Sequence, residues 1–140
     1  GLIYNDEVVS ILSFKITKEN TLKVERFASK LGYVVVGGLS KILKFLIREH
    51  SPQKIESWVD LRYGNGKSLY KLGFNVERET LGWKWTDGKN TYNRLRCRAN
   101  MDERRLSERE HAEELGWYKI YDAGQRLFSL KVKAKETYNA

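Results

Sequence analysis

The sequence predicts a single α+β domain, built on a mixed and mostly antiparallel sheet with one helical crossover at its centre. Short apolar runs recur between turn-forming residues along most of the chain, which is typical of strands. A chain of 140 residues is long enough for one such domain and too short for two ordinary ones, so residues 1–140 are expected to form one unit. One segment instead has the spacing of a single apolar helix face, formed by Leu39, Ile42, Leu43, Leu46 and Ile47.

The first part of the chain predicts antiparallel strands. Residues 2–4 and 8–16 flank Asn5 and Asp6, a turn-favouring pair, and therefore predict a β-hairpin. Residues 21–28 alternate between apolar and polar side chains, which predicts a third strand that is covered on one face.

The centre of the chain predicts a strand, a glycine loop, a helix and a second strand. Residues 34–36 and 55–59 are the strand-like runs, and residues 39–49 form the helix between them. Gly37 and Gly38 precede the helix, where the first backbone N–H groups have no intrahelical partner, so a phosphate could approach closely. A tight turn that needs the dihedral angles of glycine is the alternative.

Beyond residue 60 the predicted elements are shorter. Glycines and an asparagine in residues 61–67 predict a loop, and residues 68–72 predict a short helix. Residues 74–79 predict another strand. Residues 83–85 alternate before the turn signal of residues 87–88, which predicts a strand at a sheet edge or in a hairpin.

The last part of the chain is rich in charge. Residues 101–115 predict a charged helix, with Asn100 and Glu103 in the positions of a capping box. Residues 117–121 and 127–132 are strand-like and surround a polar turn. They therefore predict a hairpin.

Composition limits the class of partner. A formal net charge of +8 favours a polyanion such as DNA or RNA, with ordinary solubility as the alternative. The single Cys97 cannot form an internal disulfide, and together with two histidines it cannot supply the four ligands of a structural zinc site, so no metal is expected. No run approaches the roughly 18 apolar residues of a membrane span. We therefore expect a soluble protein of the cytoplasm.

Two motifs in residues 2–80 carry a family resemblance. Gly37-Gly-Leu-Ser-Lys41 precedes the central helix, and Tyr70-Lys-Leu-Gly-Phe74 lies in and after the short helix. With the order of the predicted elements, they resemble the core of the GNAT superfamily of N-acetyltransferases. The resemblance implies acetyl-CoA or another acyl-CoA as cofactor, with Tyr70 as the general acid that protonates the departing thiolate and Glu25 as a second catalytic residue. Its pyrophosphate loop would be formed by Gly37, Gly38, Ser40 and Lys41.

A wider set of motifs spans nearly the whole chain. The set resembles a GNAT-like domain that is common in phage-encoded homing-endonuclease-like proteins, downstream of a nuclease domain similar to very-short-patch repair endonucleases. The resemblance implies DNA as a partner, an upstream nuclease domain and a location inside the host cell. It also implies that the chain is the carboxy-terminal part of a longer protein. The motifs are Ser13-Phe-Lys15, Glu25-Arg-Phe27, Gly37-Gly-Leu-Ser-Lys-Ile-Leu-Lys-Phe45, Trp58-Val-Asp-Leu-Arg-Tyr-Gly-Asn-Gly66, Leu69-Tyr-Lys-Leu-Gly-Phe74 and Gly116-Trp-Tyr-Lys-Ile-Tyr-Asp-Ala-Gly124.

A basic and aromatic segment is the candidate nucleic-acid site. Arg94, Arg96 and Arg98 would share one face of an extended chain, where they could contact phosphates. Trp83 and Trp85 lie nearby in sequence and could stack on bases or sugars. The alternative for such a charged run is a solvated surface.

Two further groups of residues are candidates. Lys44 belongs to a second basic face, on the central helix. Asp60 and Arg62 follow a strand end beside a glycine-rich loop, where they form either part of a site or a local ion pair.

Three hypotheses follow for the function. The leading one is a DNA-recognition module that does not itself cut, because Val34 and Leu39 stand where a coenzyme A loop usually has other residues. The second is an acyl-CoA-dependent N-acyltransferase that uses the glycine loop and Tyr70. The third is a domain retained for protein association.

Overall fold

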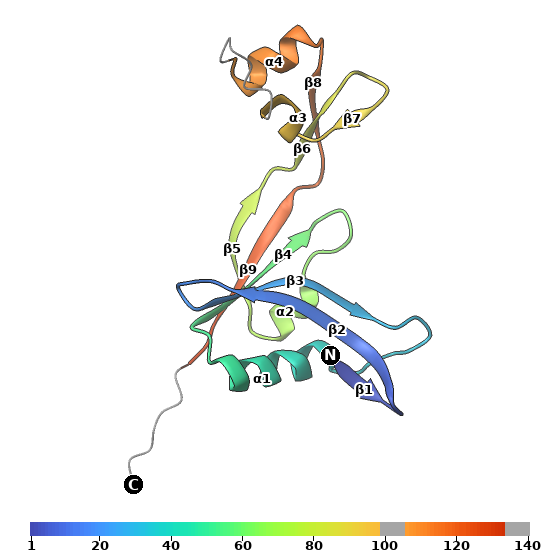
Figure 1. The fold of residues 1–140 in the computed structure, drawn as a ribbon, viewed down its shortest axis with the longest axis vertical. Helices are drawn as coiled ribbons and strands as arrows, with labels where there is room; N and C mark the ends of the chain where they lie inside the picture. Colours follow the sequence, from blue (N-terminus) through green and yellow to red (C-terminus); the bar gives the residue numbers. More distant parts are fainter. Residues whose placement is uncertain (99–105, 134–140) are drawn as a thin grey trace.

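The computed structural model describes residues 1–98 and 106–133, and two sheets carry its fold (Figure 1). The mixture of strands and helices confirms the α+β class. The strands are β1 (Leu2–Tyr4), β2 (Glu7–Ile16), β3 (Thr21–Ser29), β4 (Lys54–Asp60), β5 (Asn75–Thr80), β6 (Trp83–Thr86), β7 (Thr91–Tyr92), β8 (Tyr118–Tyr121) and β9 (Gln125–Lys131). The helices are α1 (Gly38–His50), α2 (Lys67–Lys71), α3 (Leu95–Arg98) and α4 (Glu108–Glu114).

The larger sheet has six strands in the order β1-β2-β3-β4-β9-β5. Among these described strands, only β3 and β4 run parallel, and α1 connects them. Their neighbours all pair in the antiparallel direction. The predicted mixed, mostly antiparallel sheet with a helical crossover at its centre is therefore confirmed.

The main core lies between this sheet and the helices α1 and α2, which cover one of its faces (Figure 1). The apolar face of α1 buries Ile42, Leu43 and Leu46 against strand residues that include Leu22 and Phe128. Each fully buried side chain of this kind contributes about 1.5–3 kcal/mol relative to exposure. The helix ends at His50 and is capped by Ser51, whose backbone N–H donates to the Ile47 carbonyl, and the helix prediction is thus confirmed.

Between β5 and β9 the chain leaves the larger sheet and builds a second unit, which we call the tip subdomain (described residues of 81–122; Figure 1). Its sheet has three strands in the order β7-β6-β8. A small core under α3 and α4 buries Trp85, Cys97 and Ala112. Trp83, Tyr92 and Trp117 pack around that core.

The residues before α1 correct one prediction. Residues 34–36 form no strand, and the chain reaches Gly37 through turns. Val34 and Val36 remain 92% and 80% exposed, because no neighbouring strand covers them. The strand that precedes the crossover is β3, so the apolar run marks an exposed loop.

Three predictions fall in the last part of the chain: one is confirmed, one is wrong and one lies outside the described residues. Of the two alternatives for the strand around Trp85, the hairpin is confirmed, because this strand pairs with β7 and is the central strand of its sheet. The strands β8 and β9 belong to different sheets, so the predicted hairpin between them is wrong. The turn between them is a corner, where the chain passes from the smaller sheet to the larger one. The capping box of α4 is Ser107 with Glu110, whereas the expected pair Asn100 and Glu103 lies outside the described residues.

Candidate functional sites: a basic aromatic surface and a cleft

The tip subdomain holds cationic side chains against aromatic rings. Because β6 and β8 pair with Trp83 opposite Tyr121 and Trp85 opposite Lys119, these four side chains share one face of the sheet. The Arg94 guanidinium carbon lies 3.8 Å from the centre of the Trp83 ring. The Lys119 ammonium lies 4.3 Å from the same ring. Both contacts are within cation–π range, which fixes the two charges in place.

Glu108 connects α4 to this surface. Its carboxylate accepts hydrogen bonds from Arg94 Nε at 3.0 Å and from Arg98 Nε at 2.9 Å. The indole Nε1 of Trp85 donates to it at 3.2 Å. Arg94 first, with Arg98 and Trp85, lowers the pKa of Glu108 to about 2. The carboxylate therefore stays ionised near neutral pH and holds α3, α4 and β6 together.

Several cations of the tip subdomain have no carboxylate partner among the described residues. Arg96 lies over the Tyr92 ring, 5.2 Å from its centre, and Tyr92 stacks on Trp117 at 4.0 Å between ring centres. Lys119 is exposed, and its ammonium lies 4.3 Å from the centre of the Trp83 ring and 6.0 Å from that of Trp85, with no ion pair among the described residues. Lys84 is also exposed, on the opposite face of β6, but its charge acts on the Asp60 carboxylate. The charges of Arg96 and Lys119 are available to an external anion.

The structure changes the predicted roles of the basic segment. Arg94, Arg96 and Arg98 are not extended, since residues 95–98 form α3. Arg94 and Arg98 both form ion pairs with Glu108, whereas Arg96 does not. Trp85 is 3% exposed, so it cannot stack on a base, while Trp83 is half-buried.

Sequence reasoning missed Lys119 and the role of Glu108, and it placed Lys44 on a second basic face of the central helix. The strand-like pattern around Lys119 was visible in the sequence. The pairing of this strand with β6 joins residues far apart in the chain, so no local pattern indicates it. The Ser107–Glu110 capping box was the available signal for the start of α4 and thus for Glu108. Lys44 lies on α1, at the far end of the molecule from the tip subdomain, so the fold does not bring it to the arginines (Figure 1).

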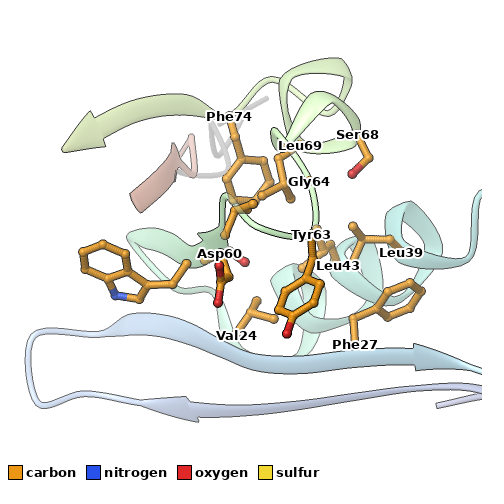
Figure 2. Close-up of a pocket in the computed structure, with 14 residues that line it drawn as sticks. Val24, Phe27, Leu39, Leu43, Asp60, Tyr63, Gly64, Ser68, Leu69 and Phe74 are labelled. Atoms are coloured by element: carbon orange, nitrogen blue, oxygen red, sulfur yellow. The ribbon is translucent and has the colours of Figure 1, made fainter. Parts of the chain in front are cut away.

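A cleft opens where the parallel strands separate. The pairing of β3 with β4 ends at Val24 and Ser57, and both strands continue beyond it. A cavity of about 350 Å³ lies at this point, at the carboxyl ends of the two strands (Figure 2). In open α/β arrangements such a position is a common ligand site. The lining residues include Phe27, Leu39, Trp58, Tyr63, Ser68 and Phe74.

The loop after β4 forms one side of the cleft. Arg62 Nε lies 3.0 and 3.1 Å from the two carboxylate oxygens of Asp60, and the Arg62 backbone N–H also donates to Asp60. Arg62 lowers the pKa of Asp60 to about 2. The predicted polar cluster is thus a local ion pair, and it borders the cleft through Asp60. The backbone N–H of Leu61 donates to Gly124 at 3.0 Å, which ties the loop to the base of the tip subdomain.

The glycines at the start of α1 serve the turn into the helix. Gly37 has a φ of 66°, where side chains other than glycine are strained, and open space surrounds its Cα position. A Cβ at Gly38 would lie 3.0 Å from Cγ1 of Val35, so this glycine packs against protein rather than against a ligand space. Ser40 is half-buried in the first turn of α1, and Lys41 borders a separate cavity beside Val34.

The two residues predicted to act in acyl transfer do not line the cleft. Tyr70 is half-exposed and meets Phe128 edge-on, with 5.0 Å between ring centres. Its neighbours Ser68 and Leu69 line the cavity instead. Glu25 is exposed and pairs with Lys15 at 3.4 Å. The fold therefore does not bring this predicted pair together at the cavity.

Comparisons with known proteins give no further identification. No protein-family model matches the chain, and no curated protein matches its sequence.

Among the described residues, no group of three or more His, Cys, Asp and Glu side chains is arranged to hold a metal ion. No described helix combines the length and apolar character needed to cross a lipid bilayer.

Proposed function

We propose that the protein is a DNA-recognition module and that the tip subdomain contacts the DNA backbone. The observation that carries the proposal is the set of cations on aromatic rings, in which Arg94, Arg96 and Lys119 each lie against a ring face. A charge held in this way loses little conformational entropy when it meets a phosphate. Arg96 and Lys119 have no carboxylate partner among the described residues, so their charge is free to displace counterions from DNA.

The overall charge supports a polyanionic partner. The chain carries a net charge of +8, which raises the rate of encounter with DNA. Recognition is the role assigned to this module. Cleavage belongs, in this proposal, to an upstream nuclease domain of a phage-type homing-endonuclease-like protein, as the motif resemblance implies.

The test is the binding of a fluorescein-labelled 20-base-pair duplex by the purified chain across a salt series. Binding should weaken as salt rises, and the slope of log K against log salt should become shallower by about 1 for each phosphate contact that is removed. Arg96→Ala and Lys119→Ala should each have this effect. Lys44→Ala is the matched control, because it removes an equal charge from α1. Equal losses in all three variants would contradict a localised interface.

Binding of an acyl-CoA is a second candidate, favoured by the position of the cleft. The parallel strands separate at the cleft, β9 lies between β4 and β5, and Leu39 of the first turn of α1 lines the cavity. This order supports the GNAT-like topology. Tyr70 and Glu25 lie outside the cavity lining, so the geometry supports coenzyme binding better than the predicted catalytic pair. This candidate therefore ranks second.

Calorimetric titration with acetyl-CoA tests the second candidate. If the coenzyme binds at the start of α1, heat of binding should disappear in Lys41→Glu, because an added carboxylate repels the pyrophosphate. Lys71→Glu makes the same charge change on α2 and should bind normally. No heat with the unmodified chain would remove this candidate and leave the DNA-recognition proposal standing.

A further inference from the structure

The mouth of the cleft exposes aromatic rings. Phe27 is 40% exposed, Trp58 43% and Tyr63 84%, and all three line the cavity. Figure 2 shows Phe27 on β3 and Tyr63 on the loop after β4, with their rings projecting into the same region. Exposed rings around a cavity gain free energy when a flat aromatic group stacks on them.

Cations accompany two of these rings. The guanidinium carbon of Arg62 lies 5.3 Å from the centre of the Tyr63 ring. That of Arg78 lies at the same distance, 5.3 Å, from the Trp58 ring. Arg78 forms no ion pair among the described residues, although its charge acts on the neighbouring Glu77 carboxylate. Neither arginine lines the cavity, whose one charged lining residue in the described part of the chain is Asp60, so the mouth combines stacking rings with flanking cations, which is a pattern of sites for unpaired nucleotides.

The cleft loop is also joined to the base of the tip subdomain. The hydrogen bond from Leu61 to Gly124 joins the cleft loop to the corner that leads into the tip subdomain. Arg126 strengthens this junction, since its Nη1 donates to the Asn65 carbonyl at 3.3 Å and its Nε pairs with Glu79. A DNA strand that continues from the tip subdomain along this junction would therefore reach the mouth of the cleft.

We infer that the cleft receives a nucleobase that has left the DNA stack. This inference rests on the proposed DNA recognition and adds the class of substrate, namely DNA with an unpaired or extruded base. The base stacks on the rings at the mouth, and the hydroxyl groups of Ser57 and Ser68 are the polar groups that reach its edge. Asp60 acts as a positioning residue, because its oxygens are occupied by Arg62 and the pair fixes the loop that carries Tyr63.

The test compares two duplexes that differ at one nucleotide. One contains a single unpaired 2-aminopurine, and the other pairs the same 2-aminopurine with thymine. The full chain should bind the unpaired form about tenfold more tightly and quench its fluorescence, because the base stacks on Tyr63. Tyr63→Ala should remove the preference and the quenching while leaving affinity for the paired duplex unchanged. Tyr4→Ala removes an equally polar exposed ring from β1 and should change neither.

A second variant blocks the cleft without removing a ring. Ser68→Trp places a large side chain on the exposed surface of α2 at the cavity, so it should also abolish the preference. Equal affinity for the two duplexes would overturn the base-receiving cleft and leave DNA recognition intact. Failure to bind either duplex would overturn both. Displacement of the unpaired duplex by coenzyme A, with no quenching by the protein, would assign the cleft to the coenzyme instead.

Discussion

The main body and the tip subdomain are stabilised by different physical means. In the body, α1 buries an apolar stripe on a six-stranded sheet, and residues such as Leu22, Ile55 and Phe128 are fully inaccessible. In the tip subdomain only Trp85, Cys97 and Ala112 form the described buried core. There an ionised glutamate, arginines and stacked rings supply much of the cohesion.

This difference shows how charge can serve structure and recognition together. The two arginines bound by Glu108 are needed to hold the helices of the tip subdomain. Arg96 and Lys119 add charge that the described fold does not neutralise. A count of arginines therefore overstates the charge offered to DNA, and the contacts of each side chain identify the available part.

The largest expected effect is on the core of the body. Phe128→Ala removes a buried ring from β9, where it packs with both α1 and α2. It should lower the free energy of unfolding by about 3–5 kcal/mol, through lost burial and the cavity left behind. Urea denaturation monitored by far-UV circular dichroism measures this loss. A loss of unfolding free energy below about 1 kcal/mol would contradict the claim that apolar burial stabilises the main body.

A smaller and local effect is expected in the tip subdomain. Glu108→Gln keeps the shape of the side chain but removes the charge that Arg94 and Arg98 share. It should cost about 1–2 kcal/mol, since Glu108 is largely shielded while its partners are partly exposed. Hydrogen exchange should accelerate in α4 and β6 and stay unchanged in α1. Uniform acceleration across both regions would contradict the separate stabilisation of the tip subdomain.

Acid should weaken the same contact by protonating Glu108. The pKa of Glu108 is about 2 in the folded protein and near the ordinary 4.5 of a glutamate in the unfolded chain, so its pair contributes fully above about 4.5. That contribution should be lost as pH falls from 4.5 toward 2. Hydrogen exchange of α4 at stepped pH measures the loss, and Glu108→Gln should remove its pH dependence. A similar pH dependence in the variant would assign the effect to other carboxylates.

The sequence predicted the body far better than the tip subdomain. The spacing of Ile42, Leu43 and Leu46 identifies α1, because local periodicity is decided by burial on one face. Residues 34–36 misled the prediction, since an apolar run has the same appearance whether or not a neighbouring strand covers it. The pairing of β8 with β6 rather than with β9 depends on contacts far apart in sequence.

The candidate sites show the same limit. The basic aromatic segment was recognised from composition, but the contact between Glu108 and Arg94 joins residues 14 apart that no local pattern links. The cleft was not predicted, because it results from the separation of β3 and β4 beyond Val24 and Ser57. Asp60 and Arg62 were identified correctly as a cluster, since their contact spans only two residues.

The most direct test of the central claim is a pair of double variants with equal loss of charge. Arg96→Ala/Lys119→Ala changes the tip subdomain, and Lys44→Ala/Arg48→Ala changes the exposed face of α1. The measurement is the affinity for the 20-base-pair duplex at one fixed salt concentration. We predict a loss of at least tenfold for the tip variant and less than threefold for the α1 variant. Equal losses, or a larger loss for the α1 variant, would contradict recognition by the tip subdomain.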